Sequence, residues 1–254
     1  MARRGPLLEA FGVYVAVTLA VVALARALAL PARAPIAPFE AIAIGALLMA
    51  VTLWLARRSG RGVRAFGVHL GGLLEPTDPS DPRPAGPLGV LDLARAARAA
   101  APHAAREAAV TCAVAAVVFP PFSLAYAVWH GLPPGDFHFG GPPDLLAVAF
   151  TQWVVVAIPE EAFFRGYLQT RLSEAWPAGV TPWGAPISVR ALLAQAALFA
   201  LMHFAVEPRP ERLAVFFPAL LFGWLRARRG GIGAASGVHA LSNVLARVLA
   251  FGWP

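Results

Sequence analysis

The stretch AIPEEAFFR, residues 157–165, places three charged side chains at the end of an apolar run. Residues 145–158 are apolar apart from one Thr and one Gln, so Glu160, Glu161 and Arg165 enter protein or lipid interior. A charge near the centre of a bilayer costs at least about 2.5–3.5 kcal/mol, and such residues usually pair with one another and carry function. The stretch therefore predicts a polar site inside a helix bundle.

Helix geometry gives the two carboxylates different tasks. Glu161 and Arg165 are four residues apart, so on a helix they share a face and form an ion pair. Glu160 lies about 100° round the helix and has no partner in the stretch. We expect Glu160 to be the carboxylate that is available for general acid–base chemistry. The plainer alternative is an ordinary salt bridge at a helix end.

The composition is that of a membrane protein. Hydrophobic residues make up 58% and charged residues 14% of the chain, whereas about a quarter of the residues in soluble proteins are charged. The net charge of +7 comes from arginines grouped between apolar runs, which indicates membrane topology and excludes a nucleic-acid surface. The bilayer is thus an expected partner and nucleic acid is not. The single cysteine excludes an internal disulfide.

Apolar runs of spanning length predict an all-α, polytopic transmembrane helix bundle of about 7–8 helices. The seven predicted spans are residues 8–30, 36–56, 108–129, 145–172, 190–206, 213–225 and 232–253. Counted from a cytoplasmic N-terminus, 15 arginines fall on the cytoplasmic side and 3 on the opposite side. This bias predicts that the N-terminus is cytoplasmic.

The chain is expected to form one integral membrane domain in two parts. Residues 1–107 would hold two transmembrane helices, a cytoplasmic connector rich in Pro and Asp at 75–87, and a surface helix at 88–107. The alternative is that this last helix packs under the bundle. Residues 108–254 would form the catalytic bundle.

Two more polar groups interrupt later spans. His203 follows Phe199 by one helical turn, and His239 and Asn243 are four apart on one face of the last span. The plainer alternative is that each of these groups only forms hydrogen bonds between neighbouring helices. Together with Glu160, however, they provide what peptide hydrolysis needs: Glu160 and His203 to activate a water, and His239 and Asn243 to donate to an oxyanion.

These motifs resemble those of the CPBP family of intramembrane proteases, which includes the CAAX prenyl endopeptidases and bacterial Abi proteins. That family carries EExxxR, FxxxH and HxxxN or HxxxD in this order on successive helices. The sequence has EEAFFR at 160–165, Phe199 with His203, and His239 with Asn243, so the resemblance covers roughly residues 145–250.

The resemblance implies a glutamic-type intramembrane peptidase. It assigns water activation to Glu160 and His203 and the oxyanion site to His239 and Asn243. It gives a supporting role to Glu161, Arg165 and Phe199. No cofactor is expected. If a zinc ion were present, His203, His239 and Glu160 would be its ligands.

The expected substrate is a membrane-associated protein or peptide precursor, for example a bacteriocin leader or a sorting tail of the kind cut by myxosortase-type relatives. An Ala- and Arg-rich chain without Lys suggests a GC-rich bacterium and its inner membrane. A non-catalytic immunity or scaffold protein of the same fold is the alternative. One mismatch stands out: His203 lies late in its predicted span, whereas Glu160 and His239 lie in the cytoplasmic halves of theirs.

Overall fold

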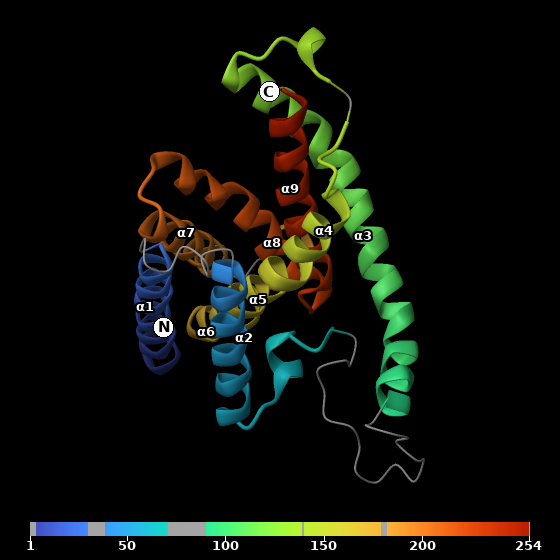
Figure 1. The fold of residues 1–254 in the computed structure, drawn as a ribbon. Helices are drawn as coiled ribbons and strands as arrows, with labels where there is room; N and C mark the ends of the chain where they lie inside the picture. The colour runs from blue at the N-terminus through green and yellow to red at the C-terminus, as the bar shows by residue number, and fades with distance from the viewer. Residues whose placement is uncertain (1–3, 30–38, 71–89, 139, 179–181, 254) are drawn as a thin grey trace.

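The computed structural model describes residues 4–29, 39–70, 90–138, 140–178 and 182–253, and within them every regular element is helical (Figure 1). The longer helices are α1 (Arg4–Leu28), α2 (Glu40–Arg58), α3 (Val90–His130), α7 (Val189–Val206), α8 (Phe216–Arg229) and α9 (Gly233–Gly252). Between α3 and α7, a continuous helical segment contains α4 (Leu145–Phe150), α5 (Ile158–Glu161) and α6 (Gln169–Ala175). The predicted all-α bundle is confirmed.

Six helices in the described ranges are long and apolar enough to cross a membrane, and the chain is an integral membrane protein. They are Gly5–Leu28, Glu40–Arg58, Leu93–His130, Leu145–Ala175, Val189–Val206 and Gly233–Gly252. The predicted span at 213–225 is wrong. Its residues divide between a 3-10 turn, η9 (Pro210–Val215), and α8, which has 14 residues. A helix of that length covers about 21 Å, less than the roughly 30 Å of a hydrocarbon core.

The helix expected at 88–107 and the span expected at 108–129 form one helix, α3, of 41 residues. The division expected at residue 107 therefore coincides with no break in the backbone. Ala is the strongest helix former, and the Ala-rich sequence around residue 107 favours continuation of the helix. The connector expected at 75–87 and the first two residues of the expected surface helix lie outside the described residues.

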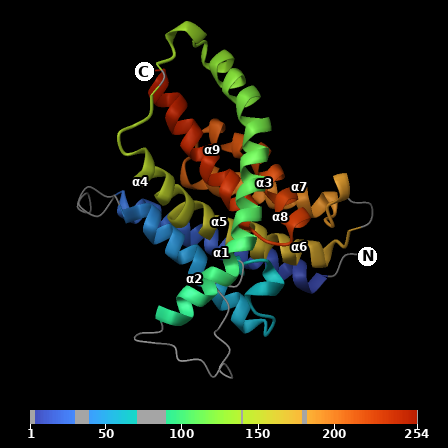
Figure 2. The same cartoon turned by 90° about the vertical axis from the view of Figure 1, so that its right-hand side faces the viewer.

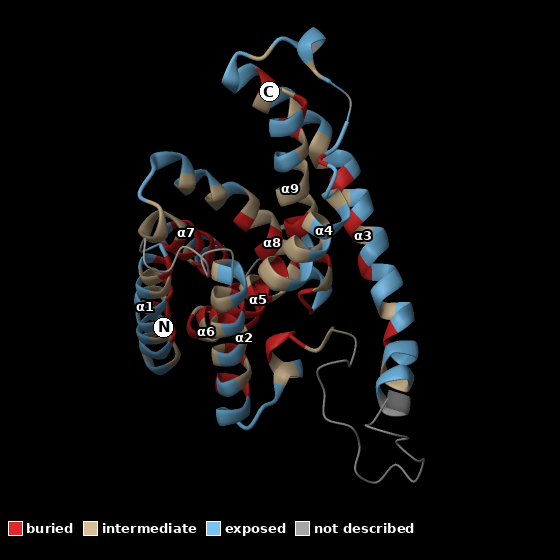
Figure 3. Cartoon of the chain, in the orientation of Figure 1, coloured by how far each residue is buried: buried red, intermediate tan, exposed pale blue. Residues whose placement is uncertain are grey.

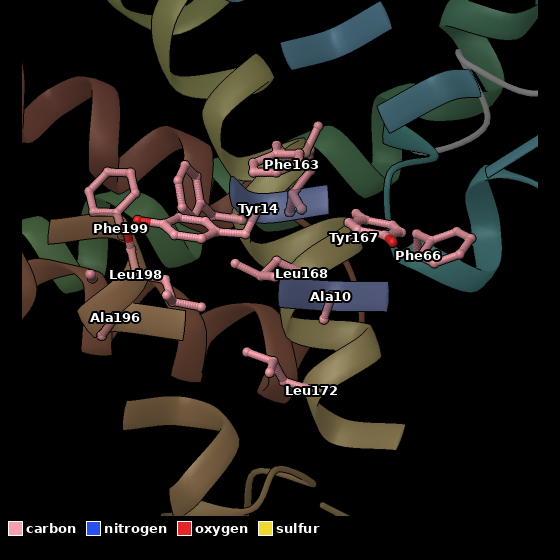
Figure 4. Close-up of a cluster of buried hydrophobic side chains, with 14 of the residues drawn as sticks. Ala10, Tyr14, Phe66, Phe163, Tyr167, Leu168, Leu172, Ala196, Leu198 and Phe199 are labelled. Atoms are coloured by element: carbon pink, nitrogen blue, oxygen red, sulfur yellow. Dashed lines mark hydrogen bonds between the residues drawn. The ribbon is translucent and has the colours of Figure 1, made fainter. Parts of the chain in front are cut away.

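The core gathers where α1, α7 and the segment after α5 meet (Figure 4). Phe163, Tyr167 and Leu168 are almost completely buried there. Tyr14 of α1 donates a hydrogen bond from its hydroxyl to the carbonyl of Leu198 in α7 at 2.9 Å. This contact joins the first helix of the chain to the helix that carries the FxxxH motif.

Helix α3 lies against α9 in both views, and most of its surface is exposed (Figures 1, 2 and 3). The contact depends on small residues of α9: a Cβ on Gly237 would lie 2.4 Å from Thr111 Oγ1. At the start of α9, Glu107 accepts hydrogen bonds from the Ala234 N–H at 2.9 Å and from Arg229 at 2.6 Å. Glu107 thereby fixes the end of α9 that leads to His239.

Candidate active site

The helix that carries the two glutamates changes its pitch on both sides of them. The turns η6 (Thr151–Ala157) and η7 (Ala162–Leu168) are π-helical and flank α5. Pro159 has no N–H and cannot donate to the carbonyl of Val155, four residues earlier. Interrupted hydrogen bonding of this kind is typical of π-bulges, which occur frequently at functional sites.

Helix α2 approaches this irregular segment closely because it has a glycine at the contact. A Cβ on Gly45 would lie 2.2 Å from the Val155 carbonyl oxygen and 3.4 Å from Pro159 Cγ. No larger residue fits without displacing backbone. Gly45 thus sets the distance between α2 and the helix that carries Glu160.

The pairing predicted from helix spacing is present. Arg165 Nη1 donates to Glu161 Oε1 at 2.9 Å, and both side chains are 0% exposed. Arg165 also donates from Nη2 to the Ala219 carbonyl at 3.4 Å. Its guanidinium carbon lies 4.3 Å from the centre of the Phe199 ring, within the range of a cation–π contact. Arg165 therefore links three helical segments through one buried cation.

His239 meets both carboxylates. Its Nδ1 lies 2.9 Å from Glu161 Oε1, and its Nε2 lies 3.7 Å from Glu160 Oε2. An ionised carboxylate can only accept a hydrogen bond, so His239 Nδ1 carries the proton in its contact with Glu161. This leaves Nε2 directed toward Glu160. The imidazole is also stacked on Phe222, with ring centres 4.9 Å apart.

Glu160 is the less engaged of the two carboxylates. Glu161 Oε1 accepts from both Arg165 and His239, whereas Glu160 makes only the longer contact with His239, and its Oε2 has no hydrogen-bond partner in the described parts of the chain. The Glu160 side chain is 16% exposed. It lines a cavity of about 390 Å³ whose other walls are mostly apolar residues of α2 and η6, with Glu40 as a second carboxylate.

His203 joins the site through Phe199. Its Nδ1 lies 3.0 Å from the Phe199 carbonyl, which can only accept, so Nδ1 donates and Nε2 is left for other partners. The Phe199 ring lies 4.4 Å from the ring of His203 and 5.9 Å from that of His239. The Phe199 ring therefore contacts both histidines. Glu160 and His203 make no hydrogen bond or ion pair with each other in the described structure.

Asn243 has a partner that the sequence did not identify. Asn243 lies one turn of α9 beyond His239, and its Nδ2 donates to Gln152 Oε1 at 2.8 Å. Gln152 was visible in the sequence as one of two polar residues in the run before the glutamates, but nothing in its spacing pointed to a residue 91 positions later. The second proton on Asn243 Nδ2 is not used by Gln152.

Across the described ranges, no three His, Cys, Asp or Glu side chains are grouped as metal ligands. Glu161, the most buried carboxylate, has a guanidinium at 2.9 Å, where a cation would be repelled.

Comparison with protein families identifies the same part of the chain. Residues 142–245 match the family model described as Rce1-like, type II CAAX prenyl endopeptidase. The matched range contains all three motifs. No curated protein and no solved structure matches the chain.

Proposed function

We propose that the chain, whose residues 142–245 match the family model of the Rce1-like type II CAAX prenyl endopeptidases, is a glutamic-type intramembrane endopeptidase. Its substrate is a membrane-associated protein or peptide precursor. The observation that carries the proposal is the difference between the two glutamates: Glu161 is held by Arg165 and His239, and Glu160 faces a cavity without a hydrogen bond to Oε2.

The first step is activation of water. Glu160, assisted by His203 Nε2, takes a proton from a water molecule, and the resulting hydroxide attacks the carbonyl carbon of the scissile peptide. The lack of a direct contact between Glu160 and His203 is compatible with a water that bridges them. The 390 Å³ cavity beside Glu160 would receive the peptide.

The second step is stabilisation of the tetrahedral oxyanion. When His239 is protonated, its Nε2 becomes a donor, and the Glu161 carboxylate at Nδ1 holds the imidazolium in place. Once Glu160 has taken the proton from water, Glu161 and Arg165 offset each other, so an imidazolium at His239 would offset the charge of the oxyanion. The free amide proton of Asn243 is the second donor. The proton taken from water then passes to the leaving nitrogen, the C–N bond breaks, and a carboxylate and an amine are released.

We propose that this chemistry needs no metal ion. Using His239 as a zinc ligand would remove the imidazole from the oxyanion site, and Glu161 is already engaged by two donors. The arginine distribution supports a cytoplasmic N-terminus. The Ala- and Arg-rich composition without Lys supports the inner membrane of a bacterium as the location.

The test compares two adjacent, isosteric substitutions, Glu160→Gln and Glu161→Gln. Membranes from cells that produce each variant are compared with wild type for loss of a processed protein by quantitative proteomics of peptide termini. Glu160→Gln should abolish processing in a protein that melts like wild type, and His203→Ala should do the same. Glu161→Gln should also lower the melting temperature, because it removes the partner of Arg165. Retained processing by either Glu160→Gln or His203→Ala would remove that residue from the catalytic centre.

A further inference from the structure

A second cavity, of about 310 Å³, lies apart from the residues of the candidate active site. Its polar lining comes from the loop after α2, from α6 and from the end of α8, namely Arg61, Gln169, Thr170, Ser173, Glu174 and Arg226. Arginines cluster in these segments, and their distribution predicts that this end of the bundle faces the cytoplasm. The cavity would then lie at the level of the phospholipid headgroups.

Arg226 is the residue in this cavity whose charge is not compensated. Its Nη2 donates to the Thr170 hydroxyl at 3.1 Å, and its Nε is buried and has no hydrogen-bond partner among the residues that the structure describes. In the described structure it forms no ion pair with a carboxylate. Burial lowers the pKa of the Arg226 guanidinium, because desolvation disfavours a charge without a counter-ion.

Three nearby arginines, unlike Arg226, form ion pairs with carboxylates. Arg61 forms an ion pair with Glu174, Arg171 pairs with Glu174 and with Glu9, and Arg229 pairs with Glu107. Glu174 lines the cavity but is already shared by two arginines. The cavity therefore keeps an excess of positive charge.

We propose that this cavity binds a phosphate group, and that its source is the headgroup of an anionic phospholipid. A guanidinium beside hydroxyl groups is well suited to phosphate oxygens, because Arg forms charge-assisted hydrogen bonds to them. Thr170 and Ser173 supply the hydroxyls, and the guanidinium of Arg226, which has no carboxylate partner in the described residues, supplies the positive charge. Free inorganic phosphate has the same chemistry and is the other source that the experiment separates.

The experiment measures phosphate binding directly. Purified full-length protein in dodecyl maltoside is mixed with phosphatidylglycerol or phosphatidylcholine, and retained lipid is counted by native mass spectrometry. In a parallel arm, thermal unfolding is followed by tryptophan fluorescence in sodium phosphate and in sodium chloride of equal ionic strength. The variants are Arg226→Gln, the double variant Thr170→Val with Ser173→Ala, and a control, Arg228→Gln, which removes an exposed charge from the same helix end.

Wild type and Arg228→Gln should retain phosphatidylglycerol in preference to phosphatidylcholine. Arg226→Gln should weaken that binding about tenfold or more, because it removes the charge-assisted bonds. Protection by inorganic phosphate that depends on Arg226, without any preference for phosphatidylglycerol, would identify the free anion as the source. Equal binding by Arg226→Gln and Arg228→Gln, or no phosphate effect in either arm, would overturn the proposal. If Arg226→Gln does not fold, wild-type binding by the double variant would also overturn it.

Discussion

His239 Nδ1 lies 2.9 Å from Glu161 Oε1, although the two residues are 78 positions apart in the chain. The contact fixes the orientation of the imidazole and aims its Nε2 at Glu160. It also gives Glu161 a second task beside its ion pair with Arg165. The supporting glutamate thus connects helix packing to the position of the proposed oxyanion donor.

Removing Arg165 should destabilise the protein. Arg165→Ala removes the ion-pair partner of Glu161, and the side chains of this pair are both 0% exposed. Breaking such a buried pair costs about 3–5 kcal/mol. Arg165→Lys should restore only part of the stability, because an ammonium cannot contact Glu161 and the Ala219 carbonyl in the same fork geometry. Melting temperature in detergent measures both effects. A stable but inactive Arg165→Ala protein would instead assign Arg165 to catalysis.

Truncation of Asn243 should slow the reaction without stopping it. Loss of one oxyanion donor typically lowers the rate by about 10²–10³, so Asn243→Ala should lower kcat and leave KM almost unchanged. The control is Gln152→Ala, which removes the partner of Asn243 but leaves its amide in place. We expect a smaller loss of kcat there. A rise in KM with unchanged kcat for Asn243→Ala would indicate a substrate contact.

Adding one methyl group at Gly45 should disturb the site from a distance. In Gly45→Ala the new Cβ would lie 2.2 Å from the Val155 carbonyl oxygen. This oxygen belongs to the backbone and cannot rotate away as the end of a flexible side chain could. Overpacking of this kind typically costs about 1–3 kcal/mol, and we expect lower melting temperature together with lower activity. Gly12→Ala in α1 is the matched control, since nothing lies within 4 Å of its Cβ. Equal behaviour of the two variants would contradict the close packing of α2.

Prolonged chelation should leave activity intact. The proposed mechanism uses the carboxylate of Glu160 and the imidazole of His203 for water activation and keeps His239 for the oxyanion. Purified enzyme dialysed against EDTA or 1,10-phenanthroline is therefore expected to cleave substrate at the untreated rate, with metal content checked by mass spectrometry. Activity that is lost on chelation and regained with zinc would reassign both histidines as ligands.

Local features of the site could be predicted from the sequence because they depend on helix geometry alone. The apolar runs around the motifs indicated spanning helices, and the spacing of Glu161 and Arg165 predicted their ion pair, which is present at 2.9 Å. The apolar run at 213–225 was predicted to span the membrane. Its hydropathy does not reveal that its first residues belong to a 3-10 turn that begins at Pro210. The sequence did not predict that α3 is continuous. A change from polar to apolar residues suggests a boundary between two helices, but it need not interrupt a helix.

The sequence by itself determined which residues are available for chemistry and which of them share a helical face. A separation of four residues fixes proximity through the helical rise and twist, whatever the helix packs against. Only the tertiary structure decided that Phe199 contacts both histidines, that Gln152 binds Asn243, and that Glu160 faces a cavity. These contacts depend on crossing points between helices, which are set by small residues and side-chain interdigitation over many positions. Spacing along one helix carries no information about them.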